Sequence, residues 1–338
     1  MTDPAVPGSR QGHVILVTTS YPTRPGDPSG HFVAAEARAL ARSGQKVSVL
    51  APSVVGQRAP GAERRDGVEV RWLPAGDAFG APGAWVRLRE RPVRMLGALR
   101  FARAARRELL KSNAARVVAH FLVPSAWPIA RGLRVPLEVV VHGSDLALVE
   151  TLPHWVRAGI AKHLAHATLR CVSAELRERL GCALGAQLAE RARVEPSPLE
   201  LDPVPDRRAA RLILGIAPDA RLVVVVGRLV ETKRARVALA AAGLVPGAEL
   251  VVVGDGPERR ELERAFPDAR FLDAIERPQA LAWLSAADVL LSASEREGAP
   301  SVVREARALG TRVVALPAGD LEAWSRSDHG LTVLSGAL

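Results

Sequence analysis

The stretch from Val289 to Ala315 reads VLLSASEREGAPSVVREARALGTRVVA, and the expected fold class follows from it. Apolar runs predict strands at Val289 to Leu291 and at Arg312 to Ala315. Pro300 is well suited to the first turn of a helix, so a short helix should cover Ser301 to Leu309 between the two strands. A strand, a helix and a second strand in this order are typical of a parallel sheet flanked by helices, which predicts an α/β protein.

The same alternation runs along all 338 residues. In the first half, strands are expected at His13 to Thr18, Val47 to Leu50, Val68 to Trp72, Arg116 to Ala119, Leu137 to Val141 and Thr168 to Val172. In the second half, further strands are expected at Leu222 to Val226, Leu250 to Val253 and Arg270 to Leu272. Four prolines between Val194 and Asp206 favour extended backbone. We therefore expect a domain of residues 1–195, a linker of residues 196–208 and a second domain of residues 209–338.

Length and composition predict a globular protein, because 48% of the residues are hydrophobic and the chain is long enough for two domains. No run approaches the roughly 20 apolar residues that a membrane helix needs, and the segment from Met1 to Gln11 has no apolar core of a signal peptide. These features predict a cytoplasmic location. Cys171 and Cys182 are too few for a disulfide scaffold or a cysteine zinc site.

The formal net charge of +10 is concentrated in part between Trp85 and Lys111, where nine residues are basic. One helical stripe holds Arg100, Arg103, Arg107 and Lys111 beside Met95, Leu99, Ala102 and Leu109, which predicts a basic amphipathic helix. The helix could dock on an anionic membrane or hold an anionic acceptor, or it could simply be a solvated face. Nucleic-acid binding is not expected, since aromatic residues make up only 4% and no nucleic-acid-binding motif is present.

Two carboxylates flank the start of the predicted helix at Ser301. Glu297 lies in the preceding loop and Glu305 lies about one turn inside the helix, so both approach one pocket at the carboxyl end of a strand. Carboxylates accept hydrogen bonds from sugar and ribose hydroxyls. The alternative is that both are ordinary surface glutamates near a helix N-terminus, where the helix dipole favours acidic groups.

Two cations follow the predicted strand that ends at Val226, in the sequence GRLVETKR. Gly227 permits a tight turn, and Arg228 and Lys233 then lie near the same edge of the sheet. Two such cations can take the place of a metal ion at a diphosphate. The alternative is a basic loop on a basic protein. A third turn, VVVGDGPE from Val251 to Glu258, is by itself only a weak glycine signal.

In this order, the segments GRLVETK, VVVGDGPE and SEREGAPSVVREA resemble the donor-binding domain of retaining glycosyltransferase family 4. Glu297 and Glu305, separated by seven residues, match the E-x7-E element of that family. Four segments of the first half are more loosely similar, and the resemblance covers most of residues 13–316; the segments are SYPTRPGDPSGHFVAAEARALARSGQKVSVLAP, AHFLVPSAW, VHGSD and CVSAELRERL.

The resemblance implies the GT-B fold, in which two Rossmann-like, doubly wound domains face each other across a cleft. The N-terminal domain would lie on the acceptor side and the C-terminal domain would bind the donor. The chain ends at Leu338, earlier than members of the family usually do, so its C-terminal domain is expected to be short.

The resemblance also implies roles for individual residues. Arg228 and Lys233 would hold the donor diphosphate, while Glu297 and Glu305 would accept from hydroxyls of the donor sugar and of the ribose, respectively. His142, which alone would more often be structural, would face the donor sugar from the first domain. Further donor contacts are implied for the backbone of Gly30, Gly298, Ala299, Pro300 and Ser301.

The activity implied is metal-independent, retaining transfer of a sugar from a UDP- or GDP-type donor, without a cofactor. The acceptor would be a glycan, a lipid-linked intermediate or a small molecule. Peripheral contact with the inner face of the cell membrane through residues 85–111 stays one of the open interpretations. Other possibilities are a non-catalytic relative that binds a nucleotide sugar or glycan, and a hydrolase or epimerase that acts on a nucleotide sugar.

Overall fold

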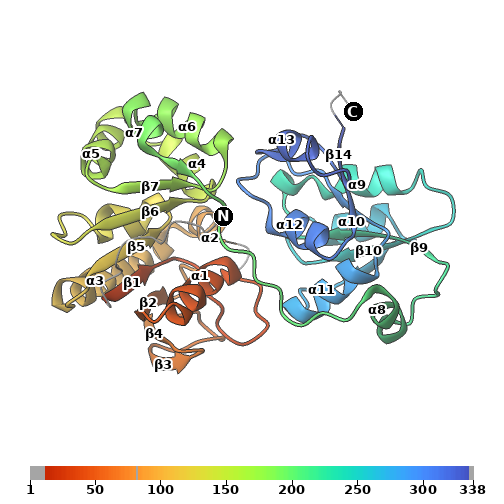
Figure 1. Ribbon diagram of the computed structural model, residues 1–338, viewed down its shortest axis with the longest axis horizontal. Coiled ribbons are helices and arrows are strands. Elements are labelled where there is room, and N and C mark those ends of the chain that lie inside the picture. Colours follow the sequence, from red (N-terminus) through yellow and green to blue (C-terminus); the bar gives the residue numbers. More distant parts are fainter. Residues whose placement is uncertain (1–11, 81–82, 335–338) are drawn as a thin grey trace, which may run out of the picture. The chain divides into compact units, whose positions relative to one another are not determined.

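The computed structural model describes residues 12–80 and 83–334. Contacts within the chain divide it into two compact units, each with its own sheet (Figure 1). The first unit comprises Met1–Thr23, Ser29–Val172 and Leu176–Pro198. The second unit comprises Arg24–Pro28, Ser173–Glu175 and Leu199–Leu338. Residues 195–206 form neither helix nor strand, as expected of a segment rich in proline.

The sheet of the first unit contains, among the described residues, eight strands in the order β3-β4-β2-β1-β5-β6-β7-β8. They are β1 (His13–Val17), β2 (Lys46–Pro52), β3 (Gly61–Arg65), β4 (Val68–Leu73), β5 (Arg116–His120), β6 (Leu137–Val141), β7 (Thr168–Cys171) and β8 (Arg193–Val194). Neighbouring strands are parallel, except that β3 and β4 form an antiparallel hairpin. The central strands are nearly continuous apolar runs because a parallel sheet is covered on both faces.

Helices and helical turns connect these strands: α1 (His31–Arg42), α2 (Ala84–Glu90), η1 (Pro92–Arg94), α3 (Met95–Lys111), η2 (Leu122–Ile129), α4 (Ser144–Glu150), α5 (His154–Leu164), α6 (Ala174–Leu184) and α7 (Ala186–Arg191). Phe101 and Leu109 of α3 pack with Ile15 and Val17 of β1 and with Ile129 of η2 in one buried cluster. Full burial of such a side chain stabilises the fold by about 1.5–3 kcal/mol.

The basic helix expected within residues 85–111 is confirmed as α3. Helical structure does not run through the whole segment. The segment divides into α2, η1 and α3, because Pro92 has no N–H to continue the hydrogen bonding of α2. The buried face of α3 is formed by small and apolar residues four apart, and it does not include the exposed Met95 and Leu99. Its buried residues are Gly97, Phe101, Ala105 and Leu109.

The sheet of the second unit contains six strands within the described part of the chain, in the order β11-β10-β9-β12-β13-β14. They are β9 (Arg221–Val226), β10 (Ala248–Val253), β11 (Arg270–Leu272), β12 (Val289–Ser292), β13 (Arg312–Ala315) and β14 (Leu331–Val333), and all pairs are parallel. The connecting elements are α8 (Arg207–Leu214), η3 (Glu231–Lys233), α9 (Ala235–Ala242), α10 (Arg259–Ala265), α11 (Arg277–Ala286), α12 (Ser301–Ala308) and α13 (Leu321–Ser325).

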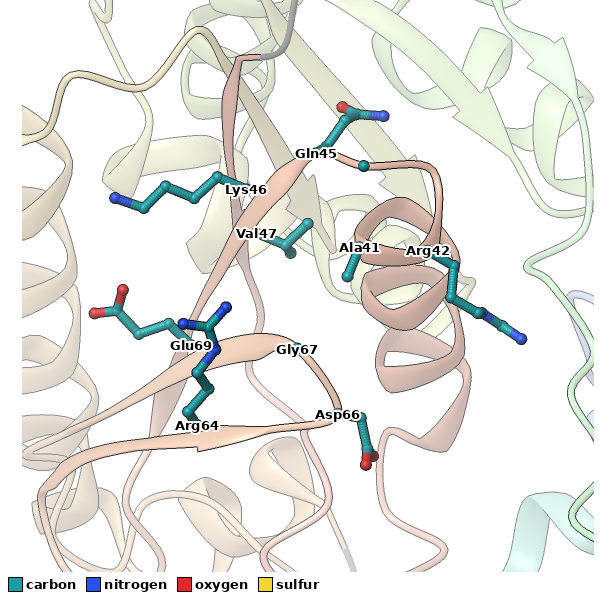
Figure 2. Close-up of a pocket in the computed structure, with 10 residues that line it drawn as sticks. Ala41, Arg42, Gln45, Lys46, Val47, Arg64, Asp66, Gly67 and Glu69 are labelled. Atoms are coloured by element: carbon teal, nitrogen blue, oxygen red, sulfur yellow. The ribbon is translucent and has the colours of Figure 1, made fainter.

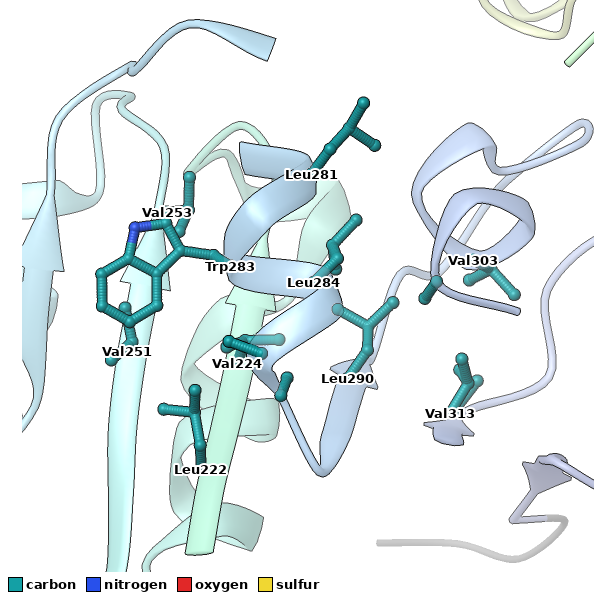
Figure 3. Close-up of a cluster of buried hydrophobic side chains, with 14 of the residues drawn as sticks. Leu222, Val224, Val251, Val253, Leu281, Trp283, Leu284, Leu290, Val303 and Val313 are labelled. Atoms are coloured by element: carbon teal, nitrogen blue, oxygen red, sulfur yellow. The ribbon is translucent and has the colours of Figure 1, made fainter. Parts of the chain in front are cut away.

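Two clusters of buried side chains cover the two faces of this sheet. On one face, Val224 of β9 packs with Leu284 of α11 and Val303 of α12 (Figure 3). On the other face, the next residue, Val225, packs with side chains of α9 and α10. Successive residues of one strand therefore enter opposite cores, which is the period of two that a doubly wound sheet requires.

The expected α/β class with two doubly wound units is confirmed. Three short strands were not expected: β3, β8 and β14. The sequence of β3, GAERR, lacks apolar alternation because this strand lies at the edge of its sheet and is largely exposed. The strands β8 and β14 have only two and three residues, so they leave almost no pattern.

Candidate functional site

The carboxyl ends of β9 and β12 lie side by side in the second unit, because these two strands are neighbours in the sheet. A hollow at this edge is lined by Arg228 and Lys233 from the segment after β9 and by Ser292 and Ser294 from the end of β12. The two predicted cations thus meet at one place, together with two serines that sequence reasoning did not single out.

Glycines keep the strand ends around this hollow in close contact. A Cβ atom on Gly254 would lie 1.9 Å from the carbonyl oxygen of Gly227, and one on Gly256 would lie 2.2 Å from that of Leu229. Gly254 also has a φ of 140°, which side chains disfavour. The glycine pattern of residues 251–258 therefore has a structural reason: the turn after β10 packs backbone to backbone against the turn after β9.

Lys233 and Glu297 are brought together from loops 64 residues apart. Lys233 is the last residue of η3, and its ammonium group forms an ion pair with the Glu297 carboxylate. A backbone hydrogen bond of 2.9 Å from the N–H of Glu295 to the carbonyl of Thr232 joins the same two loops. In this arrangement the predicted phosphate ligand and the predicted sugar ligand neutralise each other.

The loop that carries Gly298, Ala299 and Pro300 leads into α12, which begins at Ser301 as expected. The N-cap residue, Pro300, makes no side-chain hydrogen bond to the N-terminus of this helix, so its first N–H groups are suited to an anion or a hydroxyl. The loop is supported from behind by Gly319, where a Cβ atom would lie 2.7 Å from the carbonyl oxygens of Glu297 and Gly298.

Glu305 lies one turn inside α12, is only 7% exposed, and is paired with Arg277. Arg277, at the start of α11, donates to Glu305 Oε1 at 2.7 Å, to Asp202 Oδ2 at 2.9 Å and to the carbonyl of Glu200 at 2.7 Å. Glu305, which the resemblance assigns to the ribose hydroxyls, is therefore already part of a buried ion pair. Sequence reasoning missed Arg277, because nothing in the local sequence links it to a helix 28 residues further along the chain.

The first unit holds Gly30 and His142 at the carboxyl ends of its own strands. Gly30 precedes α1 with a φ of 65°, and a Cβ atom there would lie 2.3 Å from the carbonyl oxygen of Ser20. The position therefore requires glycine for close backbone packing. His142 directly follows β6, and its imidazole packs against the rings of Phe32 and Phe121 at centroid distances of 4.7 and 4.8 Å.

Asp145 fixes the backbone around His142. The carboxylate of Asp145 is 4% exposed and accepts hydrogen bonds from the N–H groups of Leu122 at 2.7 Å, Gly143 at 2.9 Å and His142 at 3.1 Å. Burial raises the pKa of the Asp145 carboxyl, and the three N–H donors oppose this rise. Burial and the charge of Arg170 lower the pKa of His142, so its imidazole is neutral at pH 7.

A second hollow, of about 520 Å³, lies at the amino ends of the strands in the first unit (Figure 2). Its lining includes the cations Arg42, Lys46 and Arg64 and the carboxylates Asp66 and Glu69. Although it is larger than the hollow beside Arg228, it lies at the end of β2 opposite to the edge where ligands bind in open parallel sheets. Its mixed charges also favour no single ligand.

Within residues 12–80 and 83–334, no three histidine, cysteine or carboxylate side chains form a group able to hold a metal ion. In the same part of the chain, no helix has the length and apolar character needed to cross a membrane.

Comparisons with known proteins agree with this architecture. Residues 220–337, the part of the chain that carries Arg228, Lys233, Glu297 and Glu305, match the family model of glycosyl transferases group 1. The chain is 36% identical over 130 residues to a D-inositol 3-phosphate glycosyltransferase of Mycolicibacterium gilvum. That match covers 34% of the chain and 29% of the relative, so less than a third of the relative's length is compared.

Solved structures are similar over nearly the whole chain. Sucrose-phosphate synthase from Thermosynechococcus elongatus has a TM-score of 0.77 at 19% identity, covering 96% of this chain and 86% of that one. HepE from Anabaena, in complex with UDP-glucose, has a TM-score of 0.63 at 19% identity with the same coverage of both chains. These similarities show the fold, and they confirm the expected GT-B architecture of two Rossmann-like units.

Proposed function

We propose that this chain is a retaining glycosyltransferase of family 4, which moves a sugar from a UDP- or GDP-type donor to a hydroxyl of an acceptor. In this reaction the bond between the anomeric carbon and the diphosphate oxygen breaks, and its electron pair leaves with the diphosphate. The acceptor oxygen bonds to the anomeric carbon on the same face and loses its proton. The observation that carries the proposal is the meeting of Arg228, Lys233 and Glu297 at one sheet edge within a group 1 glycosyltransferase domain.

The two cations are suited to stabilising the departing diphosphate without a metal ion or cofactor. Arginine presents a planar fork to phosphate oxygens, and lysine supplies a point charge. Both line the hollow at the carboxyl end of β9, where donors positioned in advance stabilise the negative charge as it develops. Uncapped N–H groups at the start of α12 add to this positive potential.

Lys233 and Glu297 are proposed to exchange partners when the donor binds. Their ion pair keeps both side chains in the hollow and only partly exposed, at 25% and 13%. A diphosphate near Lys233 would compete with Glu297 for the ammonium group. The carboxylate would then accept a hydrogen bond from a hydroxyl of the donor sugar.

Glu305 is proposed to accept from the ribose hydroxyls while Arg277 keeps it in place. A carboxylate has about four acceptor positions, so the 2.7 Å bond from Arg277 to Oε1 occupies only part of its capacity. His142 and Gly30 are proposed to contribute from the first unit, His142 at the donor sugar and Gly30 at the phosphates.

The similar proteins support the proposed donor and acceptor classes. The sequence relatives include D-inositol 3-phosphate glycosyltransferases, and the structure of HepE contains UDP-glucose. For this chain, the acceptor is proposed to be a glycan, a lipid-linked intermediate or a small molecule, and the reaction is proposed to be cytoplasmic.

Turnover of the donor tests the proposal. The purified chain would be incubated with a panel of UDP- and GDP-sugars, with glycan, lipid and small-molecule extracts, and with EDTA to remove metal ions. Release of nucleoside diphosphate and an α-linked product from an α-linked donor would support it. Donor binding without release would favour a non-catalytic relative, release without an acceptor would favour a hydrolase, and an altered sugar still joined to its nucleotide would favour an epimerase.

Peripheral contact with an anionic membrane through α3 is proposed as a second property of the chain. Val93, Met95, Leu96 and Leu99 are 69%, 49%, 57% and 41% exposed. The basic residues that share the exposed side of the helix are Arg100, Arg103, Arg107 and Lys111. Exposed apolar side chains beside cations are the combination that binds the headgroup region of anionic bilayers.

Vesicle sedimentation tests this contact. The chain should sediment with phosphatidylglycerol vesicles and stay in solution with phosphatidylcholine vesicles. Replacing Leu96 and Leu99 by serine should abolish sedimentation, whereas serine at the exposed Leu212 of α8 serves as the control. Equal sedimentation of both variants would contradict the assignment to α3.

A further inference from the structure

Behind His142 lies a buried group of titratable side chains to which the proposed function gives no role. His120 is the last residue of β5, which neighbours β6 in the sheet, and its side chain is fully buried. Nδ1 of His120 lies 3.0 Å from Nε2 of His142, within hydrogen-bond distance, and the two ring planes are inclined by only 18°. The imidazole that reaches the sheet edge therefore rests on a second imidazole inside the protein.

The opposite side of His120 faces a carboxylate. Nε2 of His120 lies 3.8 Å from Oε2 of Glu36, on α1, and both atoms are buried without a hydrogen-bond partner among residues 12–80 and 83–334. The other oxygen of Glu36 accepts from Arg170, which also lies 3.2 Å from Glu138. One oxygen of Glu36 is thus paired with an arginine, and the second oxygen is directed at His120.

Each imidazole carries one proton at neutral pH. Burial and the charge of Arg170 lower the pKa of His120 to about 3, and burial, His120 and Arg170 lower the pKa of His142. Only one of the two facing nitrogens, His120 Nδ1 or His142 Nε2, can therefore donate in the hydrogen bond between them. The direction of this single bond determines the tautomer of both rings.

Glu36 discriminates between the two directions. If His120 donated from Nδ1, its Nε2 would be an unprotonated acceptor facing the Glu36 carboxylate, and two lone pairs would oppose each other in a buried site. If His120 carries its proton on Nε2, the N–H dipole points at the carboxylate. Nδ1 then accepts from the Nε2–H of His142.

We propose that Glu36, acting through His120, holds His142 in its Nε2–H tautomer and leaves Nδ1 of His142 as a hydrogen-bond acceptor for a ligand hydroxyl. Nδ1 makes no hydrogen bond within the described residues, and it is not among their buried unpaired atoms, so a ligand can reach it. A neutral acceptor nitrogen attracts a hydroxyl and repels phosphate or carboxylate oxygens. The inference rests on the proposed function only for the identity of the ligand, which would be the donor sugar. His120 and Glu36 are positioning residues.

Two-bond ¹⁵N–¹H correlation spectra of the ¹⁵N-labelled full chain at neutral pH read the tautomer of each histidine directly. The signals are assigned with His142→Asn and His120→Gln. Both histidines are expected to be neutral and protonated on Nε2. A proton on Nδ1 of His142, or a doubly protonated ring, would overturn the inference.

Substitution of Glu36 tests the cause. In Glu36→Gln, the side-chain amide can donate to His120 Nε2, so the signals of both histidines should shift toward the Nδ1–H tautomer. Glu138→Gln is the matched control, because Glu138 also pairs with Arg170 whereas the carboxylate beside His120 is that of Glu36, and its spectrum should keep the wild-type tautomers. An unchanged Glu36→Gln spectrum from folded protein would refute the role of Glu36.

These measurements need neither donor nor turnover. If Glu36→Gln does not fold, the wild-type spectrum still decides the tautomer. If the chain transfers a sugar but His142 carries its proton on Nδ1, the inference fails and the proposed function stands. If His142 carries its proton on Nε2 but the chain releases no nucleoside diphosphate, the proposed function fails and the inference stands.

Discussion

The two sheets carry different chemistry at their carboxyl ends. In the second unit the groups at that edge are charged and paired, as in Lys233 with Glu297 and Arg277 with Glu305. In the first unit the corresponding group is a neutral imidazole, His142, enclosed by two phenyl rings and backed by a second neutral imidazole. One edge is therefore suited to a diphosphate, and the other to an uncharged hydroxyl-bearing ligand.

The largest expected effect is on the stability of the charged edge. Arg277→Ala removes the arginine that pairs with the buried Glu305, which should lower the free energy of unfolding by about 3–5 kcal/mol. Urea unfolding followed by fluorescence measures this loss. Arg236→Ala, which breaks the exposed pair with Glu261, should change little. Equal midpoints for the two variants would show that the Arg277 pair is no more important than a surface one.

A slightly smaller effect is expected on catalysis at the same edge. Under the proposed function, Arg228→Ala removes a hydrogen-bond donor to the leaving diphosphate and should lower kcat for nucleoside diphosphate release by about 10²–10³-fold. Arg260→Ala, an exposed arginine of α10, is the control and should keep the wild-type rate. A wild-type rate in Arg228→Ala would remove Arg228 from the site.

The neutral edge should reveal itself in the dependence of stability on pH. The pKa of His120 is lowered to about 3 in the folded chain from 6.5 when unfolded, so below pH 6.5 the unfolded state binds the additional proton. Stability should therefore fall as the pH drops from 6.5 toward 3, by roughly 2 kcal/mol at pH 5. Urea unfolding at pH 7 and pH 5 should show a smaller difference in His120→Gln than in wild type; identical differences would contradict the burial of a neutral His120.

The smallest effect is expected at His142 itself. His142→Ala removes one neutral hydrogen bond and should lower kcat/KM by about tenfold. Because no charge is lost, the fold-change in kcat/KM between wild type and His142→Ala should not change with salt. The fold-change caused by Arg228→Ala should become smaller at high salt. Rates at low and high ionic strength for wild type, His142→Ala and Arg228→Ala measure both. A salt-dependent fold-change for His142→Ala would contradict the assignment of a neutral role to His142.

The sequence was most informative where local patterns suffice. The strands β9 and β12 were expected from valine and leucine runs, and the start of α12 from Pro300, so the meeting of Arg228, Lys233 and Glu297 could be expected from sheet topology. Roles at the site stay predictions, because they came from the family resemblance.

What the sequence did not reveal depends on contacts across long separations. His120 stood within a quoted motif, but its alignment with Glu36 and His142 arises only when β5, β6 and α1 pack together. Arg277 could not be linked to Glu305 for the same reason.

The outer strands of both sheets bear on how the chain behaves among other molecules. An unpaired strand edge is a template for strands of neighbouring chains, and such pairing leads to aggregation. Here β3 places Glu63, Arg64 and Arg65 along one edge. The strands β8, β11 and β14 close the other edges with only two or three residues each. A charged edge strand and three very short ones offer few backbone groups with which a strand of another chain could pair. This favours a chain that stays dispersed at high concentration.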